Sequence, residues 1–355
     1  MTPSLPLMAA VCLAAVVAGP VPAGPTPIVR TGPAHARGDD HPGPHLGPHP
    51  VSHPGPHHGI VQYTAALDAA EQRRILAYWT PGRMAGAVPI DPIDPLGLIG
   101  GLDGLLSPAT RRHQAAGPVT ATSGARWIAA GRRRPAAPGT VGATTGRVFL
   151  TLNGRDFVCS ASSVRAANRD LVVTAAHCVK DGIGAWARNW TFVPGYDGGR
   201  RPFGAFTARR AFVTAQWSRG ADDDHDVAMV AVNPVGGRHL ADVVGAQPIA
   251  FNTPRGAYAY GFGFPADPPY SGRDLMYCAG PLRDDPNRQT RGQGLRCDLT
   301  AGASGGPWLS GFNPAAGVGT ITSVSSFKYS NDRHTMYGPY FDDTVRRLHA
   351  IAEKA

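Results

Sequence analysis

The sequence predicts an all-β domain over residues 140–355, closed by a C-terminal helix and preceded by a largely disordered appendage. Short runs rich in β-branched and aromatic residues alternate with turn residues after position 140, a pattern typical of β-barrels and sandwiches. Apolar residues at helical spacing between Phe341 and Ala352 predict the closing helix. The chain has 34 Pro and 45 Gly, and its first third is biased toward them, so we expect no core there. The strand candidates are 147–152, 157–164, 171–175, 203–213, 226–232, 257–262 and 318–327.

Residues 1–23 are expected to be a secretory signal peptide. The apolar run from Leu7 to Ala18 is too short to span a bilayer, and Val21-Pro22-Ala23 offers small residues for cleavage. No Lys or Arg precedes the run, so an N-terminal anchor is the alternative. We expect a secreted, extracellular protein without stable membrane insertion once the signal is removed.

Residues 24–139 form a Pro/Gly/His-rich, propeptide-like region. The segment 35–59 repeats His-Pro-Gly-Pro-His, which favours an extended linker; loose capture of zinc or copper is the alternative. Residues 64–79 have helical spacing and end at Pro81-Gly82. We expect this helix to dock on the folded domain, against the alternative of a disordered leader. Arg132–Arg134 is either a processing site or a solvated charge run.

A serine and a histidine stand in frames that suit nucleophilic catalysis. Ser304 lies in Ala-Gly-Ala-Ser-Gly-Gly-Pro (301–307), and His177 lies upstream in Thr-Ala-Ala-His-Cys (174–178). A serine hydroxyl needs a base to remove its proton, and imidazole titrates near neutrality. Asp226 opens the apolar run Val-Ala-Met-Val and is the candidate carboxylate that orients the imidazole. The alternatives are the preceding acids Asp222, Asp223 and Asp224.

In the order His177, Asp226, Ser304, these frames resemble the trypsin-like (chymotrypsin-fold) serine peptidases; subtilisins and α/β-hydrolases have other orders. The resemblance covers about residues 140–350 and implies two six-stranded antiparallel β-barrels with a C-terminal helix. It also implies a serine endopeptidase that acts through an acyl-enzyme without a cofactor. The frames are similar to those of secreted bacterial members, including the glutamyl-endopeptidase-like group.

The resemblance assigns an oxyanion hole to the backbone N–H groups of Gly302 and Ser304. Many animal members have Asp before the serine, where it pairs with the ammonium released by zymogen activation. Ala303 stands at that position. We therefore expect activation to follow removal of the appendage and not the insertion of a new N-terminus.

Substrate-binding candidates are Asp298 and Ser326. Asp298 lies six residues before Ser304, the offset at which trypsin-type members carry the acid that selects Arg or Lys. Cys297 departs from the cysteine position of those members, which puts the parallel in doubt. Ser326 belongs to 323–327, a candidate strand for pairing with substrate backbone.

Four cysteines remain after signal removal, and an even number in an exported chain predicts disulfides with three possible connectivities. The resemblance favours Cys159–Cys178, which pins the histidine loop, together with Cys278–Cys297. Without a CxxC spacing, we expect no metal site in these cysteines.

The net charge of +9 comes without a block of basic residues interleaved with aromatics, so we expect no nucleic-acid partner. The expected partner is a polypeptide substrate, and we expect a monomer. A catalytically silent binding protein on the same fold is the alternative function, because fold alone does not fix activity.

Overall fold

The computed structural model describes residues 59–90, 125–126 and 139–355. The expected signal peptide, the His-rich segment up to residue 58 and the run Arg132–Arg134 lie outside this part of the chain. In the described ranges, every helix is too short or too polar to cross a membrane.

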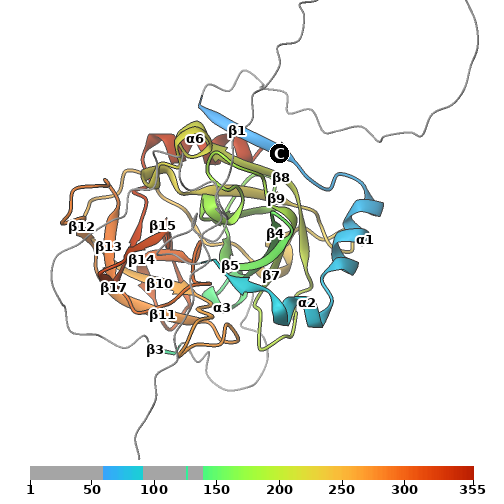
Figure 1. Cartoon of the computed structure of the whole chain (residues 1–355), viewed down its shortest axis with the longest axis horizontal. Coiled ribbons are helices and arrows are strands. Elements are labelled where there is room, and N and C mark those ends of the chain that lie inside the picture. Colours follow the sequence, from blue (N-terminus) through green and yellow to red (C-terminus); the bar gives the residue numbers. More distant parts are fainter. Residues whose placement is uncertain (1–58, 91–124, 127–138) are drawn as a thin grey trace, which may run out of the picture. The chain divides into compact units, whose positions relative to one another are not determined.

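The first half of the folded chain is a closed antiparallel barrel of six strands (Figure 1). The strands pair in the order β8-β7-β4-β5-β6-β9, and a β8–β9 pairing closes the ring. Apolar side chains such as Leu150, Phe192 and Val230 fill the interior. The strands are β4 Thr145–Leu152, β5 Arg155–Ser163, β6 Leu171–Thr174, β7 Arg188–Pro194, β8 Phe206–Thr214 and β9 Ala228–Val232.

The β4–β5 hairpin shows how the local sequence fixes register. Leu152 pairs with Arg155 across the two-residue turn Asn153-Gly154, whose φ angles are +48° and +78°. Asn-Gly is the preferred pair for such a turn, because both central residues need positive φ. This register carries Cys159 and Ser160 to the middle of β5, where the Ser160 amide donates to the Ser304 carbonyl.

Residues 59–90 pack on the outside of this barrel. β1 (Ile60–Thr64) adds an antiparallel strand to β8, and β2 (Val88–Pro89) pairs in parallel with β5. Between them lie α1 (Ala69–Tyr78) and α2 (Pro81–Gly86), drawn in blue and cyan in Figure 1. The helix expected over 64–79 begins later, because Thr64 belongs to β1 and Asp68 caps the helix at the Glu71 amide.

Trp79 is the main anchor of this docked segment. It is 1% exposed, its ring lies 5.6 Å from that of Phe149, and its Nε1 donates to the Asn189 carbonyl at 2.6 Å. Phe149 and Val158 point out of the barrel and share an apolar cluster with Trp79. All eight residues of β4 are buried as a result, since the docked segment covers the outer face of the strand.

The second half consists of two antiparallel sheets that share a core. Leu295, Trp308 and Met336 come from both sheets and pack together in this core. The first sheet contains β15 Val318–Val324, β14 Pro307–Asn313, β10 Tyr258–Gly263, β11 Met276–Pro281 and β3 Ala125–Arg126. The second contains β12 Arg283–Asp284, β13 Gln293–Arg296, β17 Asp332–Gly338 and β16 Phe327–Tyr329.

The two halves meet at a fourth apolar cluster, which the C-terminal helix completes. Helix α6 (Asp343–Ala352) contributes Val345 and Leu348, and Asp342 caps it by accepting from the amides of Thr344 and Val345. The predicted all-β class with a closing helix is therefore confirmed. The remaining short helices are α3 Val141–Thr144, α4 Ala215–Gly220 and α5 Leu240–Val244, with 3-10 turns at Ala176–Cys178 and Asp223–His225.

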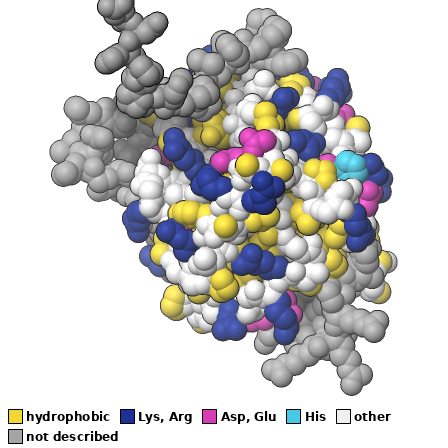
Figure 2. Space-filling model, turned by 90° about the vertical axis from the view of Figure 1, so that its right-hand side faces the viewer, with side chains coloured by type: hydrophobic (Ala, Val, Ile, Leu, Met, Phe, Trp, Pro, Cys, Tyr) yellow, Lys and Arg dark blue, Asp and Glu magenta, His cyan; other side chains and the backbone are white. Residues whose placement is uncertain are grey.

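Lys and Arg side chains are scattered over the face that Figure 2 shows, with apolar and acidic side chains between them. Among the described residues, Arg74 pairs with Glu71 and Arg83 pairs with Asp156. The positive charge on this face is therefore distributed and does not form one stripe.

Candidate active site

The histidine and aspartate candidates meet at the junction of the two halves. His177 lies in the 3-10 turn after β6, and Asp226 immediately follows the turn that precedes β9. Because β6 and β9 are paired neighbours, their ends bring the two residues together. Nδ1 of His177 lies 2.7 Å from Oδ2 of Asp226, and the His177 backbone N–H donates to Oδ1 at 2.9 Å.

This contact defines the state of the imidazole. A carboxylate can only accept, so Nδ1 carries the proton that it shares with Asp226. In the neutral imidazole, Nε2 is then the nitrogen with the free lone pair. It is buried and has no hydrogen-bond partner in the described part of the chain.

The other acids near Asp226 have different partners. Asp222 caps the Asp223–His225 turn and lies 3.1 Å from Nδ1 of His225. Asp224 forms an ion pair with Arg291 at 3.2 Å. Asp226, at 1% exposure, is therefore the carboxylate that contacts His177.

The environment of Asp226 keeps it ionised. Burial alone would raise the pKa of its carboxyl group, but His177 and the hydroxyl of Ser326 hold that pKa below its ordinary value. Ser326 donates to Oδ2 at 2.5 Å. A buried carboxylate with three donors is thus stable as an anion beside the imidazole.

The position of Ser326 differs from the sequence expectation. Residues 323–327 are not one strand: β15 ends at Val324 and β16 begins at Phe327. The Ser326 amide donates to the Tyr337 carbonyl at 2.9 Å, and its hydroxyl is used by Asp226. Sequence reasoning missed this contact with Asp226, because nothing in the local spacing indicates it.

Ser304 lies in the loop between β13 and β14. Its Oγ is buried and, like Nε2 of His177, has no hydrogen-bond partner among the described residues. The Ser304 carbonyl accepts from the Ser160 amide at 2.8 Å, and the next amide, that of Gly305, donates to the Ser325 carbonyl at 2.7 Å. The serine backbone is therefore fixed on both sides, while its hydroxyl is uncommitted.

The glycines of this loop are required by close packing. Gly305 has φ +78°, and an added Cβ would lie 2.0 Å from Oγ1 of Thr174. At Gly306 an added Cβ would lie 1.9 Å from the Phe262 carbonyl oxygen. Gly302 has φ +93°, where side chains are rarely tolerated.

Two amides of the loop are oriented but unused. In the described part of the chain, no group accepts a hydrogen bond from the N–H of Gly302 or of Ser304. Both belong to the loop that presents the Ser304 hydroxyl. Two such donors can stabilise negative charge on an oxygen placed between them.

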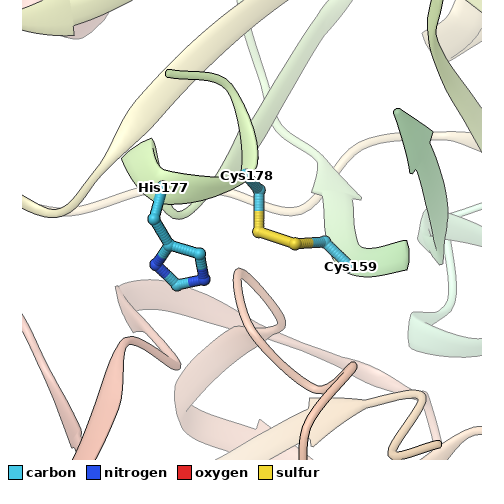
Figure 3. A group of neighbouring side chains, drawn as sticks. All are labelled: Cys159, His177 and Cys178. Carbon is cyan, nitrogen blue, oxygen red and sulfur yellow. A yellow bond between two sulfur atoms is a disulfide. The ribbon is translucent and has the colours of Figure 1, made fainter. Parts of the chain in front are cut away.

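The Cys159–Cys178 pair forms a disulfide beside His177 (Figure 3), and Cys278–Cys297 forms a second one. In Figure 3 the histidine ring extends toward the loops of the second half, with the disulfide to one side of it. Cys159, Cys178 and His177 lie close enough to hold a metal ion, but the two sulfurs are bonded to each other and supply no thiolate.

Asp298 lies in the same loop, four residues before Gly302. One of its carboxylate oxygens is buried without a partner in the described ranges. Burial and the nearby charge of Asp298 raise the pKa of Tyr270 to about 12. Burial lowers the pKa of Lys328 to about 8, partly offset by the charge of Asp298. The charge of Asp298 therefore acts on Lys328, whose Nζ donates to the carbonyls of Cys297 and Arg333.

Comparisons with known proteins show the family of the chain. A family model described as a trypsin-like peptidase domain matches residues 159–313. Protease Anisep from Arthrobacter nicotinovorans has 40% sequence identity to this chain. Its crystal structure matches with a TM-score of 0.58, over 60% of this chain and 96% of that one. The thermostable serine protease AL20 from an extremophilic microorganism is 38% identical, with a TM-score of 0.58, over 60% of this chain and 98% of that one.

The chain belongs to the trypsin-like serine peptidases, a family of endopeptidases. A Glu endopeptidase structure shares the fold at 18% identity and a TM-score of 0.51 over 66% of this chain and 99% of that one. An extracellular metalloprotease of Bacillus subtilis is 28% identical over 100 residues, which are 28% of this chain. The matched stretch spans 32% of that relative, about a third of its length. The two disulfides fit an extracellular protease.

Proposed function

We propose that this protein is a secreted serine endopeptidase that hydrolyses polypeptides through an acyl-enzyme on Ser304. One observation carries the proposal: His177 is held by Asp226 through Nδ1, while its Nε2 and the Ser304 Oγ are both buried and uncommitted. A base with a free lone pair and a nucleophile with a free hydroxyl are the two parts that acyl transfer needs.

The proposed acylation step uses these groups in turn. Oγ of Ser304 attacks the carbonyl carbon of the scissile peptide bond as Nε2 of His177 takes its proton. The carbonyl oxygen becomes an oxyanion that accepts hydrogen bonds from the amides of Gly302 and Ser304. The carbon–nitrogen bond then breaks, and His177 returns the proton to the leaving amine.

Deacylation repeats the sequence with water. Nε2 of His177 takes a proton from the attacking water, the ester bond to Ser304 breaks, and the proton returns to Oγ. Asp226 contacts the imidazole of His177 and does not touch the substrate in this proposal. Its anionic form, favoured by its lowered pKa, stabilises the imidazolium that forms in each step.

For substrate recognition we propose a polypeptide in extended conformation and no cofactor. Asp298 is the candidate for contacting the side chain before the scissile bond, although its charge also acts on the buried Lys328, which makes it less suited to select Arg or Lys. Ser326 is a candidate for backbone contacts only, since Asp226 uses its hydroxyl. We propose a monomer without nucleic-acid partners.

Secretion and processing belong to the same proposal. Residues 1–23 would direct export, and residues 24–139 would be the propeptide-like region of a zymogen, with the peptidase domain over 140–355. The burial of Trp79 on the barrel supports a role of the docked segment 59–90 in folding.

A catalytically silent binding protein is the alternative function. Such a protein needs no uncommitted nucleophile, and a buried hydroxyl without a partner costs stability. The burial of Ser304 Oγ without a hydrogen bond therefore favours the enzyme.

The test is hydrolysis of an unfolded polypeptide by the secreted protein and by Ser304→Ala, His177→Ala and the double variant. We expect each single variant to lose several orders of magnitude of kcat and the double variant to be little worse, because the groups act as a unit. Ser310→Ala and His349→Ala are the controls, as both side chains bind elsewhere. Hydrolysis by Ser304→Ala at the wild-type rate contradicts the proposal.

A further inference from the structure

The loop that carries Gly302 and Ser304 lacks the ion pair by which a carboxylate before the serine can fix it. Ala303 occupies that position and is fully buried. It packs so closely on Gly263 that a Cβ added there would lie 2.9 Å from the Ala303 Cβ. The orientation of the two amides must therefore come from other contacts.

Planar peptide geometry shows which contacts matter. In a trans peptide the N–H points opposite to the preceding C=O, so holding one carbonyl aims the next amide. The Ala301 carbonyl accepts from the Ala266 amide at 2.7 Å, which aims the Gly302 N–H. The Ala303 carbonyl accepts from the Gly306 amide at 3.0 Å, which aims the Ser304 N–H.

The peptide between these two, Gly302–Ala303, is held at both of its polar groups. Its N–H donates to the Thr300 carbonyl at 3.2 Å, and its carbonyl is held by one side chain. The hydroxyl of Ser160 donates to the Gly302 carbonyl at 2.8 Å and accepts from the Phe264 amide at 2.8 Å. Ser160 is completely buried in the middle of β5. The hydroxyl thus ties the loop to both halves of the molecule, through β5 and through the residue after β10.

The backbone of Ser160 holds the same loop. Its amide donates to the Ser304 carbonyl at 2.8 Å, and its carbonyl accepts from Oγ1 of Thr174 at 2.8 Å. Ser160 therefore makes four hydrogen bonds: its backbone N–H donates, its carbonyl accepts, and its hydroxyl both donates and accepts. Two of these four bonds go directly to Gly302 and Ser304.

We propose that Ser160 is a positioning residue of the oxyanion hole, whose hydroxyl sets the Gly302–Ala303 peptide in place of an ion pair at position 303. This inference rests on the proposed function. A displacement of that peptide would break the Ser160 bond and move Gly302, and with it the Gly302 N–H on the adjoining peptide. The hole is consequently formed by internal contacts and needs no newly released N-terminal ammonium.

The experiment compares Ser160→Ala with Ser162→Ala. Ser162 is a matched control, because it is also fully buried on β5 but its hydroxyl donates to the Ser163 carbonyl. Active sites are counted by fluorophosphonate titration, so that kcat refers to folded protein. We expect Ser160→Ala to lose about 10- to 100-fold in kcat with KM nearly unchanged, less than the loss of a whole oxyanion donor.

A second readout separates positioning from general damage. A peptide boronate, which places an oxygen in the hole, should bind Ser160→Ala more weakly by the factor lost in kcat. A peptide product that does not use the hole should bind unchanged. If Ser160→Ala folds poorly, Ser160→Thr and Ser160→Val are compared instead, because their side chains have similar shapes and only Thr has a hydroxyl. The Thr variant should keep most of the kcat per titrated site, and the Val variant should lose it.

Any of three results overturns the inference. The first is that Ser160→Ala has the same kcat and the same boronate affinity as Ser162→Ala, and the second is that Ser160→Ala weakens the binding of boronate and of product equally. The third is that Ser160→Thr and Ser160→Val have the same kcat. Failure of the proposed function is distinguishable, because the wild type itself would then neither hydrolyse peptides nor titrate with fluorophosphonate.

Discussion

Ser326 and His177 donate to the same oxygen of one buried carboxylate. Oδ2 of Asp226 lies 2.5 Å from the Ser326 hydroxyl and 2.7 Å from Nδ1 of His177. Ser326 comes from the second half of the fold, while Asp226 and His177 come from the first barrel. The contact links the two halves at the site and helps to keep Asp226 anionic.

Replacing Ser326 by Ala should raise the pKa of Asp226, because the lost hydrogen bond favours the anion. A carboxyl group with a depressed folded pKa contributes stability that is lost as the pH falls through that pKa. In the variant this loss should begin at higher pH, and stability at neutral pH should fall by about 1 kcal/mol.

Acid unfolding followed by circular dichroism measures this shift. Ser323→Ala is the control, because its hydroxyl donates to the Pro339 carbonyl at 2.8 Å, away from the triad. Equal acid midpoints for the two variants would show that Ser326 does not support the Asp226 anion.

Gly305→Ala should destabilise the protein and abolish activity. The new Cβ would lie 2.0 Å from Thr174 Oγ1 and 2.5 Å from the Ser160 carbonyl oxygen, and φ is +78°. We expect a loss above about 3 kcal/mol, from left-handed strain and overpacking together. Gly311→Ala isolates the strain, since φ is +59° and no atom lies within 4 Å of its Cβ. A similar melting temperature for the two variants contradicts the packing account.

Trp79→Ala should destabilise the folded unit by about 3–5 kcal/mol, because a buried aromatic anchor is lost. Leu76→Ala, in α1 shortly before Trp79 and 37% exposed, should change stability by less than about 0.5 kcal/mol. Urea unfolding of the full chain measures both. If Trp79→Ala unfolds like the wild type, the docked segment 59–90 contributes nothing to stability.

Lys328 should give the protein a rise in stability at alkaline pH. Its pKa is lowered by burial to about 8, so above that pH the native state loses this proton before the unfolded chain does. The free energy of unfolding should therefore rise between pH 8 and pH 10, by at most about 1.4 kcal/mol per pH unit.

Lys328→Met lacks this titration, so its stability relative to the wild type should decrease over the same range. Urea unfolding at several pH values supplies the comparison. Parallel curves for wild type and variant would mean that Lys328 is not perturbed.

The chain order of the triad candidates and the β-rich pattern could be predicted because they depend on local sequence. The frame around His177 and the apolar run after Asp226 are visible without structure, and the Asn153-Gly154 turn fixes its hairpin locally. By contrast, β17 (Asp332–Gly338) carries charged residues and is a strand only because β13 and β16 pair with it.

The supporting contacts of the site are long-range and leave no sequence signal. Ser160 lies 142 residues from its partner Gly302, and Ser326 lies 100 residues from Asp226. Serine is common on such strands and loops, so only the fold identifies these two. The strand β1 was missed for a similar reason, since its partner β8 lies in another part of the chain.

Covalent labelling tests the central claim most directly. The secreted protein is treated with a fluorophosphonate, digested and analysed by tandem mass spectrometry. We expect one adduct on Ser304, a labelling rate lower by several orders of magnitude in His177→Ala and Asp226→Asn, and no adduct at this site in Ser304→Ala. An adduct on another residue, or equally fast labelling of His177→Ala, would contradict the assignment of Ser304 and His177 as nucleophile and base.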